Sequence, residues 1–123
     1  MVEKNRADIK ARSFEFAVRV IKLVEKLSKN LAGYKIGGQL LEAGTSAGAN
    51  IEEATGGFSK KDFTYKMRVA LKEARESNYW LRLIKVSELF KGDELVFLLK
   101  ESEELRKILT SIVKTSKGQQ RTS

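Results

Sequence analysis

One stretch decides the fold of this chain: Ser46-Ala-Gly-Ala-Asn50-Ile51-Glu52-Glu53-Ala54, followed by Gly56-Gly57-Phe58-Ser59-Lys60-Lys61-Asp62-Phe63 and Ala70-Leu-Lys-Glu73-Ala-Arg-Glu76-Ser-Asn-Tyr79-Trp80. A helix of small residues ends at the glycine pair. Ser59 begins the next helix, because its hydroxyl can cap free backbone N–H groups. Asp62 stands where a capping box places its acid, although Glu or Gln is the usual residue there. The stretch therefore predicts a helix, a short loop and a second helix.

Apolar side chains at steps of three and four extend this pattern in both directions. They predict helices over about 8–30, 34–55 and 60–90, with Gly92 ending the third and Asp93 able to cap a fourth. Short connections make neighbouring helices antiparallel, so we expect an all-α, up-down-up-down four-helix bundle over residues 1–115. The polar tail 116–123 lacks apolar anchors and is expected to be disordered.

Composition excludes several classes of protein. The 123 residues fit one domain, and the chain has no cysteine, histidine or proline. Disulfides and thiolate metal sites are therefore excluded, and the commonest general base and metal ligand is missing. The longest apolar run, Leu95 to Leu99, is too short to span a bilayer, and the N-terminus lacks the apolar core of a secretory signal. We expect a soluble, cytoplasmic protein.

The second predicted helix is rich in glycine. It holds Gly37, Gly38, Gly44 and Gly48, and each glycine costs roughly 1 kcal/mol relative to alanine inside a helix. Close approach of a neighbouring backbone is the offset we expect at Gly44 and Gly48. At Gly37 and Gly38, close packing and a frayed or kinked first half of the helix are both open.

The chain resembles the family of small four-helix-bundle proteins first known from intervening sequences in bacterial 23S rRNA genes. The similarity rests on the Ser46…Asn50-Ile51-x-Glu53 run, the Ser59-x-x-Asp62-Phe63 helix start and the Ala70…Glu73…Trp80-Leu81 helix. This resemblance implies a bundle that assembles as a ring-like homo-oligomer, commonly a pentamer, without established catalytic activity. A related branch is an accessory subunit that binds reverse transcriptase and nucleic acid in diversity-generating retroelements.

Two positions depart from the pattern of that family. Glu42 stands near where many relatives carry Arg, and Ala54 replaces the Gly that usually follows the glutamate at Glu53. Both changes are compatible with the fold. The first alters the surface charge and weakens any transfer of an RNA site from relatives.

Polar residues on the second and third predicted helices admit two interpretations. Glu52, Glu53, Glu73 and Glu76 suggest a carboxylate metal site, but the Glu-x-x-His pairs of di-iron bundles cannot form without histidine. The alternative that we favour is a structural polar cluster that fixes the second helix against the loop and the third helix. Its members are Ser46, Asn50, Glu53, Ser59, Asp62 and Glu73. No serine has a histidine partner for nucleophilic catalysis, so we expect no enzyme, no cofactor and no bound metal.

Positive charge is concentrated on the first and third predicted helices, and the third carries its cations on one face. The net charge is +8, which makes polyanions plausible partners. At about 100° per residue, Arg68, Lys72, Arg75 and Arg82 share one face with Tyr79, which can stack on an unpaired base. The alternative is a solvated face whose charges pair locally, as Lys72 would with Glu76. Lys60 and Lys61 beside the helix start form either an anion site or a plain capped loop.

Two helices carry more apolar rows than one core requires. The first has Phe14, Val18 and Ile21 beside Phe16, Val20 and Leu23, and either row can face inward. The third has Val69, Trp80 and Leu83 outside its main apolar stripe. A second apolar side indicates a subunit interface, and tryptophan is common at interfaces. A wide core stripe is the alternative.

Three hypotheses follow. The first is a non-enzymatic homo-oligomer that binds nucleic acid, foremost structured RNA, through the basic faces of its helices. The second is a protein-interaction scaffold or an accessory subunit of a nucleic-acid enzyme such as a reverse transcriptase. The third, a carboxylate metal-binding bundle, has the least support.

Overall fold

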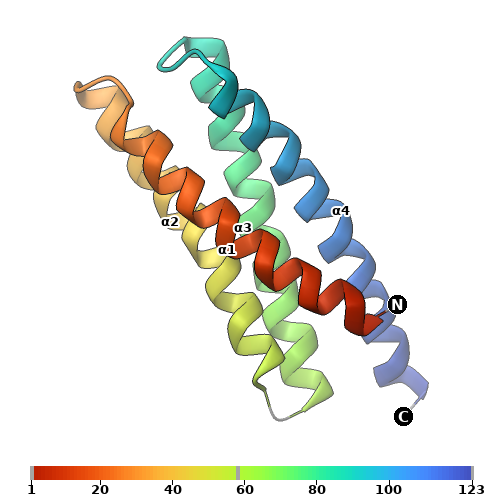
Figure 1. The fold of residues 1–123 in the computed structure, drawn as a ribbon. Coiled ribbons are helices and arrows are strands. Elements are labelled where there is room, and N and C mark those ends of the chain that lie inside the picture. The colour runs from red at the N-terminus through yellow and green to blue at the C-terminus, as the bar shows by residue number, and fades with distance from the viewer. Residues whose placement is uncertain (1, 58, 123) are drawn as a thin grey trace.

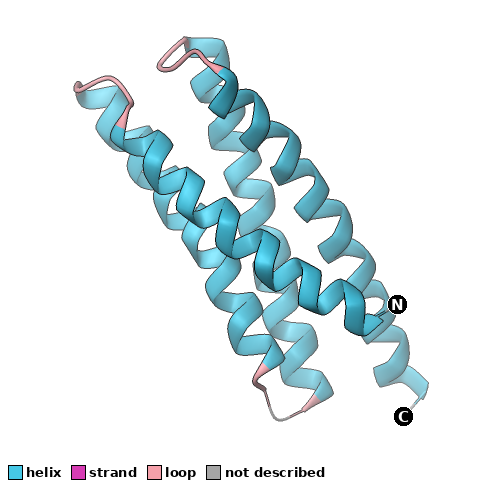
Figure 2. Ribbon diagram, in the orientation of Figure 1, coloured by secondary structure: helices cyan, strands magenta, loops and turns pink. Residues whose placement is uncertain are grey.

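The computed structural model consists of four α-helices: α1 (Val2–Glu25), α2 (Leu31–Thr55), α3 (Lys60–Ser87) and α4 (Asp93–Thr122). The structure describes residues 2–57 and 59–122, with side chains over 9–57 and 59–118; Phe58 of the predicted loop and Ser123 of the predicted tail lie outside the described residues. Only short loops join the helices, and no strand occurs in the described ranges (Figure 2). The all-α prediction is confirmed.

Each helix packs on two others. α1 and α3 both contact α2 and α4, so the four helices enclose one core. Figure 1 shows the α1–α2 and α3–α4 connections at one end of the molecule, and the α2–α3 connection at the other. Over the described residues, no helix combines the length and the hydropathy that a membrane-spanning segment requires.

The core follows the predicted apolar spacing. Its largest fully buried side chains come from all four helices: Ile9, Phe16, Val20, Leu23, Leu40, Ile51, Met67, Leu81, Ile84, Leu98, Leu105 and Leu109. Burial of a side chain of this size stabilises a fold by about 1.5–3 kcal/mol. The structure also decides between the two rows on α1, because Phe16, Val20 and Leu23 face inward while Phe14 and Ile21 are exposed.

Two predicted helix ends are wrong, and the residues that cap the helices explain why. The first helix stops at Glu25 instead of Asn30, because Asn30 begins the next one: its Oδ1 accepts a hydrogen bond of 2.9 Å from the Gly33 amide. α3 stops at Ser87, before Phe90, since Glu88 adopts a left-handed conformation with φ of 61°. The predicted cap at Ser59 is confirmed, with its Oγ accepting from the Asp62 amide at 3.0 Å.

The C-terminal tail differs from the sequence-based expectation. Residues 116–122 continue α4 as helix instead of being disordered. Ser116 is buried, and its hydroxyl shares a hydrogen bond with that of Thr64 on α3. A polar side chain therefore anchors the last turns, a contact that a count of apolar residues does not detect.

The glycines of α2 differ in their surroundings. A Cβ at Gly44 would lie 3.0 Å from both Val20 methyl groups, one at Gly48 would lie 3.4 Å from a backbone oxygen of α1, and one at Gly37 would lie 3.1 Å from Leu27. At Gly38 nothing lies within 4 Å. Close packing is therefore observed at Gly44 and Gly37, against side chains instead of the expected backbone, whereas a Cβ at Gly48 would make ordinary contact with the α1 backbone. The helix is continuous through Gly37 and Gly38, so no kink is needed.

The α1–α4 seam is clamped by two arginines. Arg12 donates to both carboxylate oxygens of Glu101, with distances of 2.9 and 2.8 Å. Arg19 donates to Glu94 at 3.2 Å and lies 4.0 Å from the ring centroid of Phe97. Fork-shaped guanidinium–carboxylate pairs fix geometry as well as energy, so these contacts align the first and last helices.

Candidate nucleic-acid interface

The predicted basic face of α3 is a continuous exposed stripe. Arg68, Lys72, Arg75 and Arg82 are all exposed, and Tyr79 is 46% exposed among them. Lys61 and Tyr65 continue the same line toward the start of the helix, and the Tyr65 ring is 62% exposed. We call these seven residues the α3 stripe. It is about 31 Å long at 1.5 Å per residue.

Local pairing does not neutralise this stripe. Among the described side chains, no carboxylate lies within 4 Å of Arg68, Lys72, Arg75 or Arg82. In particular, Lys72 does not form the ion pair with Glu76 that the alternative interpretation proposed. The four charges therefore face solvent, where they are available to a polyanion.

Arg82 is held in place by a polar relay that leads from the exposed surface to a buried serine. Its Nε donates to Asn78 Oδ1 at 2.9 Å, and Asn78 Nδ2 donates to Ser102 Oγ on α4 at 2.9 Å. Ser102 is fully buried, and the guanidinium carbon of Arg82 lies 5.7 Å from the Tyr79 ring centroid. Sequence reasoning found Arg82 but missed Asn78 and Ser102, because the relay crosses between two helices.

The two lysines at the start of α3, Lys60 and Lys61, are exposed beside the Ser59 cap. The same first turn carries Asp62, whose charge opposes binding of an anion at this helix end. The structure therefore leaves the anion site a prediction and adds Lys61 to the α3 stripe.

The predicted polar cluster is divided into three parts. Asn50 donates to Ser46 on its own helix, at 2.9 Å to the carbonyl and 3.2 Å to the hydroxyl. Glu53 pairs with Lys66 at 2.9 Å, and both line a hollow with Asp62 beside the α2–α3 loop. The hydrogen bond from Lys66 to Glu53 raises the pKa of the lysine. The ion pair of Glu53 and Lys66 therefore links α2 to α3.

Glu73 lies apart from both groups. Burial raises the pKa of its carboxyl, and the nearby charges of Glu76 and Glu42 add to this effect while Lys72 opposes it. No group of three or more aspartate or glutamate side chains in the described part of the chain is arranged to hold a metal ion.

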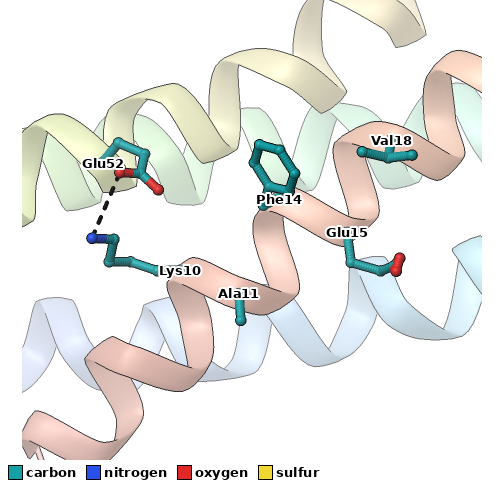
Figure 3. Close-up of a pocket in the computed structure, with 6 residues that line it drawn as sticks. All are labelled: Lys10, Ala11, Phe14, Glu15, Val18 and Glu52. Atoms are coloured by element: carbon teal, nitrogen blue, oxygen red, sulfur yellow. Dashed lines mark ion pairs between the residues drawn. The ribbon is translucent and has the colours of Figure 1, made fainter.

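The outer row of α1 forms an exposed apolar surface. Phe14 is 67% exposed and Ile21 is 43% exposed, with Val18 half-buried between them. Figure 3 shows Phe14 pointing from α1 toward α2, beside the 3.6 Å ion pair of Lys10 and Glu52. A hollow next to Phe14 is floored by small residues of both helices: Ala17, Thr45, Gly48 and Ala49.

The apolar row of α3 behaves differently. Val69, Trp80 and Leu83 are half-buried. Trp80 packs against the core of its own chain, and its ring meets that of Tyr79 edge to face at 5.0 Å. For Trp80 the structure therefore favours the wide core stripe, and the tryptophan does not require a second subunit.

Comparison with known families agrees with this architecture. Residues 5–111 match the model of the 23S rRNA-intervening sequence protein family. The chain belongs to this family. The match spans all four helices of the structure, which confirms the resemblance noted from the Ser46–Trp80 stretch.

A solved structure supports the same conclusion. The chain is 38% identical to a protein of unknown function from the S23 ribosomal protein family of Bacteroides thetaiotaomicron, with a TM-score of 0.82. The similarity covers 89% of this chain and 98% of that one. Comparison with curated proteins produced no match. The relatives therefore establish the fold and the family, and the chemistry has to be argued from this chain's own surface.

Proposed function

We propose that this family member is a non-enzymatic protein that binds nucleic acid, foremost structured RNA in the cytoplasm, through the basic face of α3. The observation that carries the proposal is the run of exposed charges at Arg68, Lys72, Arg75 and Arg82, which have no carboxylate partner among the described residues. Spacings of three and four residues place these cations on one straight line, as a run of phosphates requires. The +8 net charge of the chain favours the same class of partner.

The test is a change of charge on this face alone. A variant with R68Q, K72Q, R75Q and R82Q should bind a labelled RNA hairpin far more weakly at low salt than the unmodified chain. Each phosphate contact contributes about 0.7–0.9 to the slope of log K against log salt. The slope should therefore fall by about 3.

The matched control removes the same charge elsewhere. K22Q, K35Q and K114Q change exposed lysines on the other three helices, and K26Q changes one in the α1–α2 turn. With these four changes, binding should keep most of its salt dependence. Equal weakening in both variants would show that net charge alone attracts RNA. An unmodified chain that binds no RNA at low salt would refute the proposal.

We also propose that the helices form an antiparallel up-down-up-down bundle and that copies of it assemble into a ring-like homo-oligomer, with a pentamer as the first expectation. The exposed Phe14 and Ile21 support assembly, because such apolar patches commonly mark contact surfaces. Since these residues lie on α1 and the α3 stripe lies on another helix, assembly leaves the basic face accessible.

A second candidate function uses the same apolar surface. Phe14 and the hollow beside it could receive a different protein, such as the nucleic-acid enzyme that this chain would then accompany. Association of that enzyme with the chain at high salt and after nuclease treatment would favour this function. If the enzyme no longer associates with the variant that lacks the four α3 charges, the contact is instead indirect and passes through RNA.

A further inference from the structure

A groove between α3 and α4 adjoins the α3 stripe and shares only Arg82 with it. Its volume is about 580 Å³, which lies in the range of small-ligand sites. α3 contributes Asn78, Arg82 and Lys85, and α4 contributes Val96, Leu99, Lys100 and Glu103. Arg82 belongs to both surfaces, so a chain lying along the stripe would reach the groove at this residue.

The groove is positively charged. Arg82, Lys85 and Lys100 form no ion pair within the described part of the chain. The single acid in the lining, Glu103, is engaged by Arg106 at 3.2 and 3.5 Å. That hydrogen bonding lowers the pKa of Glu103, with Lys107 and Arg82 adding to the effect. Three cations thus remain to face an anion.

The groove also offers apolar surface beside its charges. Val96 is 61% exposed and Leu99 is half-buried. Tyr79 lies outside the lining, but its ring centroid is 5.7 Å from the guanidinium carbon of Arg82, which belongs to the lining. Apolar and aromatic surface next to clustered cations matches a nucleotide, which combines a flat base with an anionic phosphate. An acidic peptide would use the cations and leave the ring of Tyr79 without a role.

We infer that this groove binds an unpaired nucleotide of a single-stranded segment, with its phosphate at Arg82, Lys85 and Lys100 and its base stacked on Tyr79. The inference rests on the proposed function and specifies which part of the nucleic acid is recognised. A duplex conceals the faces of its bases, whereas a single strand presents them to exposed rings such as those of Tyr79 and Tyr65. Asn78 is a positioning residue, because it orients Arg82 toward the phosphate without contacting the nucleotide.

The experiment compares labelled short oligouridine with an RNA duplex by fluorescence anisotropy, using the full chain. K85Q with K100Q should weaken oligouridine binding and lower its salt slope by about 1.4, or about 0.7 for each phosphate contact. The matched control, K22Q with K114Q, should leave that slope unchanged. Circular dichroism verifies that each variant retains its helices.

Two further substitutions separate stacking and positioning from charge. Tyr79→Ala should weaken oligouridine binding about 5- to 100-fold, as loss of one stacked base predicts, while Tyr79→Phe retains the affinity and duplex binding is unaffected. Asn78→Ala should weaken oligouridine binding several-fold with no change in salt slope, because the charge of Arg82 remains. A merely structural role of Asn78 would lower stability and leave affinity intact.

The outcomes separate a failure of the groove inference from a failure of the proposed function. If the chain binds the duplex as tightly as oligouridine, or if K85Q with K100Q and Tyr79→Ala leave binding unchanged, the groove inference is overturned while the proposed function stands. If the chain binds neither probe at low salt, the proposed function fails and the inference fails with it.

Discussion

Gly33 and Gly38 lie on the same helix and differ sharply in their surroundings. A Cβ at Gly33 would lie 1.8 Å from the backbone oxygen of Ser28, which cannot move without displacing the α1–α2 turn. At Gly38 no atom lies within 4 Å. One glycine is therefore required by close contact, while the other only lowers helix propensity.

The same substitution should accordingly have opposite effects at the two sites. Gly38→Ala should raise the free energy of unfolding by about 0.5–1 kcal/mol, since alanine is the better helix former. Gly33→Ala should lower it by at least about 1–3 kcal/mol, the usual cost of overpacking. Urea denaturation measures both values. Equal effects at the two positions would contradict the contact assigned to Gly33.

Glu73 gives a prediction about pH. Burial and the charge of Glu76 raise the pKa of Glu73 in the folded chain above its ordinary value of 4.5. The folded state therefore holds this proton more tightly than the unfolded state does. Its contribution to stability is complete below pH 4.5 and is lost as pH rises through the raised folded pKa.

Glu73→Gln should therefore stabilise the protein at neutral pH, and the gain should disappear as pH falls below the ordinary pKa of a glutamate. Urea denaturation of both proteins across this range measures the difference, and a carboxyl NMR titration of Glu73 reports its pKa directly. A gain that stays constant with pH would show that packing, not charge, causes the effect.

At the scale of the helices, two ion pairs join α1 to α4: Arg12 with Glu101, and Arg19 with Glu94. Arg12 and Glu101 have side chains only 30% and 15% exposed. In such partly buried sites, removal of one partner leaves the other without its hydrogen bonds. This seam should be the most sensitive to loss of a charge.

Glu101→Gln should lower the free energy of unfolding by about 1–2 kcal/mol, because the negative charge and one of the two oxygens that accept from Arg12 are lost. The control is Glu104→Gln on the same helix. Its ion pair with Lys107 is exposed, so the change should stay within about 0.5 kcal/mol. Chemical denaturation of the two variants provides the comparison. A similar loss in both would contradict a special role for the clamp.

Helix existence was predictable from sequence, whereas helix ends were not. Apolar spacing found all four helices and the core residues Ile51, Met67 and Leu81, because burial selects side chains at the helical period. The end of α1 was misplaced, since Asn30 has the same local pattern whether it ends one helix or caps the next. The extension of α4 was missed because Ser116 is anchored by a hydroxyl contact.

Of the candidate site, the exposed charges were predictable from sequence, and the contacts that hold them in place were not. The charges of the α3 stripe follow from sequence periodicity, since exposed positions repeat at three and four residues. The relay from Ser102 through Asn78 does not, because those residues are 24 positions apart and meet only when α3 packs on α4. The inward row of α1 was also undecidable, as two apolar rows share one spacing.

At the scale of the whole molecule, the two surfaces of interest lie on different helices. The apolar row with Phe14 is on α1, and the α3 stripe is on α3; these two helices are not neighbours in the bundle. Self-association and nucleic-acid binding therefore need not compete. Copies joined through α1 would present several basic faces at once, which would raise avidity for a long polyanion.

Phe14→Gln should lower the solution mass measured by sedimentation equilibrium. The substitution removes the aromatic ring of this row, and with it apolar surface that copies would bury against one another. Val86→Gln is the matched control. Val86 is 81% exposed on α3, and its replacement should leave the mass unchanged. An unmodified chain that sediments as a monomer, or a Phe14→Gln variant of unchanged mass, would contradict assembly through α1.

The short connections described above also have a kinetic consequence. Three of the four helix pairs join neighbours in sequence, so each can form as a local hairpin with little loop-closure entropy. The α1–α4 pair instead brings together Arg12 and Glu101, which are 89 residues apart. Refolding should therefore be fast, as in other chains of low contact order, and closure of this seam should be its last step.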